Sequence, residues 1–224
     1  MAIYETASEE SVRKVLEPEL NMISDSDLRD KAVKAWTMAC RLGGYRRLED
    51  CPTEQFERLP NTPNIEHQKQ TARIAAAIIK VLKEAGNPAD VNEDYTITAA
   101  LCHDLGKPVE WRAKASGIFY QGVYYGKNPE MPPLEDTSYQ VARHSIWSFH
   151  IALSVGMPER IAHAIGMHSR EGDHILRSPE SLVVYFADHI WWQLIGQPKI
   201  TDKTWWREAK ARRVKAPERV LRKG

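Results

Sequence analysis

The sequence lacks the features that would tie it to an oxidising compartment or a membrane. Its 224 residues include three cysteines, Cys40, Cys51 and Cys102, and none of them forms a CxxC pair. An odd number of widely spaced cysteines predicts reduced thiols and a cytoplasmic protein. The first residues are polar, so we expect no signal peptide, and no apolar run approaches the about 18 residues that span a bilayer. We therefore expect no membrane partner.

The sequence also lacks a net charge large enough to attract a polyanion. Lys and Arg together number 31 and Asp and Glu number 30, so the formal net charge is +1. Binding to nucleic acid is therefore not expected, and a small molecule is the expected partner. Basic residues do gather in 207–224, which predicts either a solvated helix end or a contact with an anion or RNA. The sequence leaves the oligomeric state open.

Helical patterns fill most of the chain, and neither an internal repeat nor a low-complexity segment interrupts them. Apolar residues recur at spacings of three and four between capping residues, which predicts an all-α fold. The expected helices cover about 9–16, 26–43, 65–86, 93–105, 138–155, 158–169 and 178–195, with a last one beginning near 201. Glycines among aromatic residues, followed by prolines, break the pattern over 109–136 and predict an irregular excursion or a short β-hairpin.

Five of these helices each carry one ionisable residue on an apolar stripe. These residues are His67, Asp104, His144, His168 and Asp188. An inward-facing His is often a hydrogen-bonded core residue, but an unpaired buried carboxylate is costly and needs a cation or a proton. The stripes contain few Lys or Arg residues that could serve. A metal would satisfy all five groups at once, and imidazole with carboxylate suits Fe, Mn, Ni, Co or Zn.

The segment CHDLGKP at 102–108 resembles the His-Asp signature of the HD-domain superfamily of metal-dependent phosphohydrolases. An upstream helical His in IEHQKQ and a downstream Asp in FADHI complete the ordered pattern, which covers about 64–194. The segments ARHSIW and GMHSR resemble those that bring additional His ligands in members with two metals. The resemblance therefore implies an HD-domain helical bundle with a binuclear metal site.

The resemblance also implies which residues hold the metals. The first metal would be held by His67, His103, Asp104 and Asp188, and the second by Asp104, His144 and His168, with Asp104 bridging. Both are expected to be divalent transition metals, Fe or Mn before Ni, Co or Zn. Structural or surface roles are expected for His150, His163, His174 and His189. We expect one compact domain, with N-terminal helices at 1–63, a metal-binding catalytic core at 64–200, and a C-terminal helix and basic tail at 201–224.

Two metals that share Asp104 would lower the pKa of a bridging water toward about 7 and so supply a hydroxide at neutral pH. Asp104 is therefore expected to be catalytic, and no GxSxG motif or other protein nucleophile is evident. Substrate binding is expected from Lys107, which would also be catalytic, and from Arg143 and Arg170; each could equally be a solvated charge at a helix end. The excursion at 109–136 is either a lid that sets specificity or a packed hairpin.

Three functions stay open on this sequence. The resemblance favours a metal-dependent hydrolase acting on a small phosphoester or nucleotide. The same hydroxide could instead hydrolyse a non-phosphate bond, for example by opening a cyclic ketone or amide. Some relatives with a similar set of six ligands are oxygenases that use a di-iron site and O2, and the HDLGK segment does not separate them from the hydrolases.

Overall fold

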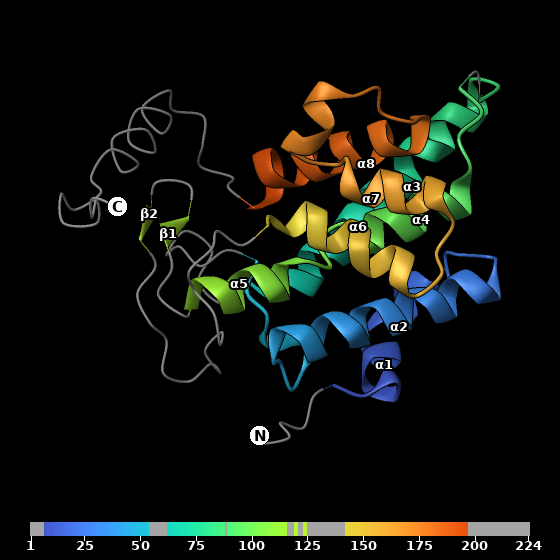
Figure 1. Ribbon diagram of the computed structural model, residues 1–224. Helices are drawn as coiled ribbons and strands as arrows, with labels where there is room; N and C mark the ends of the chain where they lie inside the picture. The colour runs from blue at the N-terminus through green and yellow to red at the C-terminus, as the bar shows by residue number, and fades with distance from the viewer. Residues whose placement is uncertain are drawn as a thin grey trace.

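The computed structural model describes residues 7–53, 62–87, 89–115, 119–120, 123–124 and 142–196 of the chain. Within these ranges the protein is all-α, as the sequence predicts, apart from one short hairpin (Figure 1). The helices are α1 (Glu9–Leu20), α2 (Ser26–Gly43), α3 (Asn64–Glu84), α4 (Glu93–Cys102), α5 (Lys107–Ala115), α6 (His144–Ser154), α7 (Glu159–Gly166) and α8 (Pro179–Ile190). The hairpin pairs β1 (Phe119–Tyr120) with antiparallel β2 (Val123–Tyr124), inside the range predicted for the excursion.

Shorter helical segments complete the described chain. Single 3-10 turns cover Leu48–Asp50 and Arg170–His174, and α8 continues directly into a π-helical segment, Trp191–Gly196. No helix in the described part of the chain is both long and apolar enough to cross a lipid bilayer. The helix expected from about 201 and the basic tail lie outside the described residues.

Side-chain caps fix where several helices begin. Asp25 accepts hydrogen bonds from the backbone N–H groups of Asp27 and Leu28 at the start of α2, and Ser178 caps α8 in the same way. α2 ends where Gly44 adopts a φ of 76°, a left-handed conformation that side chains disfavour. These starts, and the end of α2, agree with the sequence prediction because the capping signals are local.

Helix bounds close to the site differ from the prediction. α4 ends at Cys102 instead of 105, and a new helix, α5, begins at Lys107, so that residues 109–115 of the predicted excursion are helical. α6 begins at His144, since residues 142–143 are not helical, and α7 ends at Gly166 instead of 169. Asp104 and His168 therefore lie in turns that follow helices. α1 is also longer than predicted and runs through Pro18 to Leu20.

The bundle is built around α4, which packs against α2, α3, α7 and α8, while α3 and α7 also pack on α8 (Figure 1). α2 packs against α4 and α5, and the buried Trp36 donates from Nε1 to the carbonyl oxygen of Leu101 at 3.0 Å. A Cβ on Gly43 would lie 2.5 Å from the Cβ of Pro108, and one on Gly106 would lie 2.1 Å from a backbone oxygen of α6. The two glycines thus allow the HDLGKP turn to sit against both α2 and α6.

Candidate metal centre

Six buried His and Asp side chains converge from five segments of the chain. They are His67 in the first turn of α3, His103 and Asp104 in the turn after α4, His144 at the start of α6, His168 after α7, and Asp188 in the last turn of α8. Each is at most 8 % exposed. The structure thus brings together all six residues that the sequence singles out.

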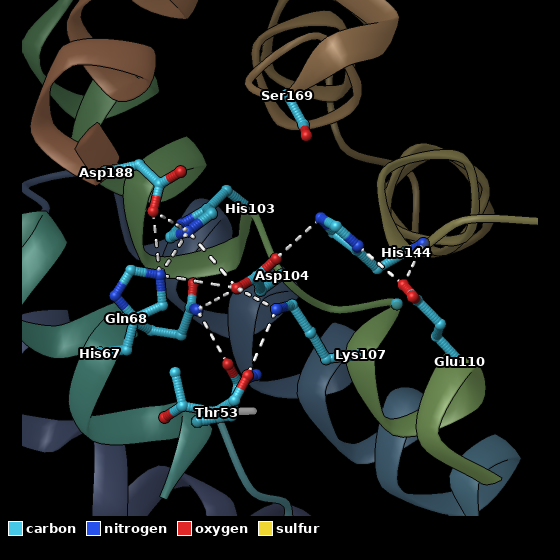
Figure 2. Close-up of polar contacts among 12 residues, drawn as sticks. Thr53, His67, Gln68, His103, Asp104, Lys107, Glu110, His144, Ser169 and Asp188 are labelled. Atoms are coloured by element: carbon cyan, nitrogen blue, oxygen red, sulfur yellow. Dashed lines mark hydrogen bonds and ion pairs between the residues drawn. The ribbon is translucent and has the colours of Figure 1, made fainter. Parts of the chain in front are cut away.

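Asp104 lies between two pairs of histidines, of which His67, His103 and His144 are labelled in Figure 2. Its Oδ2 atom faces His67 and His103, whose Nε2 atoms lie 3.5 and 3.7 Å away. Its Oδ1 atom faces His144 and His168, whose Nε2 atoms lie 3.3 and 3.7 Å away. One carboxylate therefore presents each of its two oxygens to a separate pair of imidazoles.

Asp188 completes the group around His67 and His103. Its Oδ1 atom lies 3.0 Å from Nε2 of His67 and 3.6 Å from Nε2 of His103, and those two nitrogens are 3.1 Å apart. Within the described part of the chain this buried oxygen has no hydrogen-bond partner other than these two ring nitrogens. Two trios have ligand atoms close enough to share an ion: His67, His103 and Asp188, and His103, Asp104 and His168. The second trio has His103 where the sequence suggested His144.

Hydrogen bonds hold the outer nitrogens of the histidine rings. Nδ1 of His103 lies 2.7 Å, and Nδ1 of His168 2.5 Å, from the backbone carbonyl oxygen three residues earlier. Nδ1 of His144 lies 2.7 Å from Oε2 of Glu110. Because a carbonyl oxygen only accepts hydrogen bonds, the proton of a neutral ring beside it sits on Nδ1. Nε2 then carries a lone pair that is directed at the carboxylates.

Both carboxylates are ionised despite their burial. Burial alone would raise the pKa of Asp104, but Lys107 and three neighbouring histidines hold this pKa well below its usual value. Burial would likewise raise the pKa of Asp188, and the two histidines beside it lower it instead. Ionised carboxylates are the form that binds a metal.

The histidines show where the site favours a positive charge. Burial lowers the pKa of His67 and of His168, which keeps both rings neutral at neutral pH. Burial would also lower the pKa of His103, but Asp104 and Asp188 beside it raise it overall. The space between the two carboxylates therefore attracts a cation.

A model of the HD domain family matches residues 64–191, which is more than half of the chain. The chain belongs to the HD domain family. The match contains all six converging residues, from His67 to Asp188. HD domains bind divalent metals, and the family implies metal-dependent phosphohydrolase activity in general. A comparison with curated proteins and one with solved structures found no match.

Lys107 is buried inside the site and is not the solvated charge at a helix end that the sequence also allowed. Its Nζ atom lies 3.8 Å from Oδ2 of Asp104 and donates to the carbonyl oxygen of Thr53 at 3.3 Å. It also lies 5.3 Å from the ring centroid of Trp111 and 5.7 Å from that of Trp192. The expectation that the buried carboxylates have few internal cations is therefore wrong for Asp104. Lys107 is the first residue of α5 and follows Asp104 by three residues, so the start of this helix brings its side chain to Asp104.

Arg143 and Arg170, from which the sequence predicts substrate binding, line the same cavity as Lys107. Arg143 forms an ion pair with Glu171, with 3.1 Å between Nη1 and Oε1, and its Nη2 donates to Oγ of Ser169 at 3.2 Å. Arg170 is exposed. The cavity has a volume of about 340 Å³. Its lining residues are Asp104, Lys107, Arg143, His144, His168, Ser169, Arg170, Asp173, Tyr185, Asp188, His189, Trp192 and Gln193. This volume suits a small molecule.

Two polar residues at the centre carry no signal of their own in the sequence. Gln68 donates from Nε2 to Oδ2 of Asp104 at 3.1 Å, and its place beside His67 in the chain is the only hint. Glu110 holds His144, but 34 residues separate the two, so no spacing connects them. Only the fold brings Glu110 to the site.

The remaining histidines mostly keep to the expected structural and surface positions. His163 accepts a hydrogen bond from the backbone N–H of Ser178 at 3.3 Å, and His150 is exposed on α6. His189 is exposed and lies against the ring of Tyr185, with 4.0 Å between centroids, but it also lines the cavity. His174 is exposed and is not among the lining residues.

Proposed function

We propose that this HD domain is a hydrolase that uses two divalent metals to cleave small phosphoesters or nucleotides. The first metal would be held by His67, His103, Asp104 and Asp188, and the second by Asp104, His144 and His168. One observation carries the proposal: the two oxygens of Asp104 face two separate pairs of imidazole nitrogens. A carboxylate that bridges two metals needs this arrangement.

The chemistry of the donor atoms fits two cations. Imidazole lone pairs that face carboxylate oxygens across 3.3 to 3.7 Å repel them unless a positive charge lies between. The buried Oδ1 of Asp188, which in the described chain faces only the ring nitrogens of His67 and His103, supports the same reading. A mixed set of nitrogen and oxygen donors favours Fe or Mn, with Ni, Co or Zn as alternatives.

Two such metals, when bound, supply a water of lowered pKa and screen the charge of a phosphate group. The protein's own side chains do the rest. Asp104 fixes the two halves of the site relative to each other. Lys107 lies beside Asp104 on the cavity wall, where its ammonium group can neutralise a phosphate oxygen as negative charge develops on it. Lys107 is thus the proposed catalytic cation.

Three cations on one small cavity support a phosphate-bearing substrate. Lys107, Arg143 and Arg170 all line the cavity beside Asp104. Arg143 is held by Glu171 and Ser169, so its guanidinium group is already oriented. A cavity of about 340 Å³ holds a small molecule and not a polymer. We therefore propose a small phosphoester or nucleotide as the substrate.

The experiment is metal analysis of protein purified without oxygen, followed by a panel of phosphoesters, nucleotides, cyclic ketones and cyclic amides with and without O2. Two metals per chain and O2-independent release of phosphate are expected. Ring opening without phosphate release would favour hydrolysis of a non-phosphate bond. Turnover that consumes O2 would favour a di-iron oxygenase.

A matched pair of variants on α6 separates a metal effect from a helix effect. His144→Ala removes a proposed ligand, whereas His150→Ala removes an exposed ring from the same helix. His144→Ala should lose activity and part of the bound metal, and His150→Ala should keep both. If both variants keep two metals and full activity, the proposed second site does not exist.

A further inference from the structure

Glu110 on α5 holds His144 in two ways through one oxygen atom. Its Oε2 accepts a hydrogen bond from the backbone N–H of His144 at 2.8 Å and lies 2.7 Å from Nδ1 of the same residue (Figure 2). Both residues are buried. A carboxylate that accepts the backbone hydrogen also accepts the ring proton, so the ring carries its proton on Nδ1. Nε2 then presents its lone pair to Asp104.

At Nδ1, the other three histidines at the centre have neutral partners. Nδ1 of His103 and Nδ1 of His168 lie against backbone carbonyl oxygens, and Nδ1 of His67 lies 3.3 Å from the hydroxyl group of Thr71. Among the contacts described for these rings, a carboxylate at Nδ1 is found on His144 only. Such a partner fixes the orientation of the ring and makes Nε2 a stronger donor to a metal.

The two halves of the site also differ in charge. The half that contains Asp188 has a second carboxylate oxygen from Asp104. The half that contains His144 has, among its proposed ligands, only the other oxygen of Asp104. A dication in this half would be less well compensated in a buried, weakly polar environment. Glu110 stands directly behind this half and supplies the missing negative charge.

We propose that Glu110 is a positioning residue for the second metal. It sets the tautomer of His144, and it balances the charge of an ion to which it does not itself bind. The inference rests on the proposed two-metal function. It also accounts for the start of α6, because Glu110 on the unexpected helix α5 holds the first N–H of α6, that of His144.

The first test measures the tautomer of His144 by 15N NMR in chelator at neutral pH, which needs no metal. In the wild type, Nδ1 should carry the proton. In Glu110→Gln the proton should move toward Nε2, because the charged Oδ1 of Asp104, 3.3 Å away, is then a stronger acceptor than the amide. An unprotonated Nδ1 in the wild type, or the same proton position in both proteins, overturns the inference.

The second test titrates the metal-free protein with Co²⁺ alone and follows both binding steps by calorimetry and by visible absorption. In Glu110→Gln the affinity for the second ion should fall by about 10- to 100-fold, while the first ion binds as in the wild type. The matched control is Glu180→Gln. Glu180 is also buried and holds a backbone N–H at a helix start, that of Asn92 before α4, at 3.0 Å, but its ion pair is with Arg160.

The control keeps the outcomes distinct. Glu180→Gln should lower the melting temperature and leave both Co²⁺ affinities unchanged. Unchanged affinity for the second ion in Glu110→Gln, or an equal loss in Glu180→Gln, overturns the role of Glu110 and leaves the two-metal function standing. A wild-type protein that binds fewer than two ions overturns both.

Discussion

Asp104→Asn is the sharpest test of the site, because it removes one charge and keeps the shape of the side chain. With metals present, an amide bridges poorly, and the second ion loses its only carboxylate ligand among the described residues. Activity should fall below detection and one metal should be lost. The helical fold should persist, since the site lies at the ends of helices and not in the apolar core between them.

In chelator the same substitution should destabilise the protein. Unit charges 3.8 Å apart, the distance from Nζ of Lys107 to Oδ2 of Asp104, attract by about 4 kcal/mol at an effective dielectric constant of about 20. Removing one partner of a buried pair costs about 3 to 5 kcal/mol, because the other charge stays buried. At about 3 kcal/mol, a chain of this length should melt about 6 to 12 °C lower. From the sequence alone, Asp104 is a buried carboxylate without a cation beside it. Replacing it with Asn would then be expected to raise the melting temperature in chelator.

The assay combines scanning calorimetry with and without chelator, bound metal by elemental analysis, and catalytic rate. Asp173→Asn is the control, because Asp173 is an exposed carboxylate that lines the same cavity and pairs with Arg177. It should keep both metals and its melting temperature. Near-normal turnover with two metals in Asp104→Asn would refute the bridge, and a higher melting temperature in chelator would refute the ion pair with Lys107.

Three further predictions test neighbouring parts of the argument. Replacing both His144 and His168 with Ala should remove one metal of two, as measured by elemental analysis; two retained metals would contradict the assignment. His150→Gln and His163→Gln should keep both metals, with a loss of about 1 kcal/mol or less in chemical denaturation. The folded-state pKa of Asp188 lies below its unfolded value of 3.8, so its contribution in chelator is present above about pH 4 and is lost as the pH falls further. Asp188→Asn should flatten the fall of melting temperature below that pH, and an unchanged acid slope would count against it.

The sequence identified most of the helices and all six residues of the centre. Local signals account for this: capping residues such as Asp25 and Ser178 mark helix starts, and apolar residues recur at helical spacing. The ordered His and Asp segments, with HDLGKP among them, identified the family before any contact was known. How these six residues pair with metals remains a proposal.

The tertiary structure decided what no local pattern encodes. Lys107 becomes the partner of Asp104 because α5 starts at Lys107, inside the HDLGKP segment, and Glu110 reaches His144 across 34 residues of sequence. The destabilisation predicted for Asp104→Asn in chelator follows from that packing, as does the charge difference between the two halves of the proposed site. Periodicity reports which face of a helix is buried, but the partner that a buried charge meets depends on where other helices end.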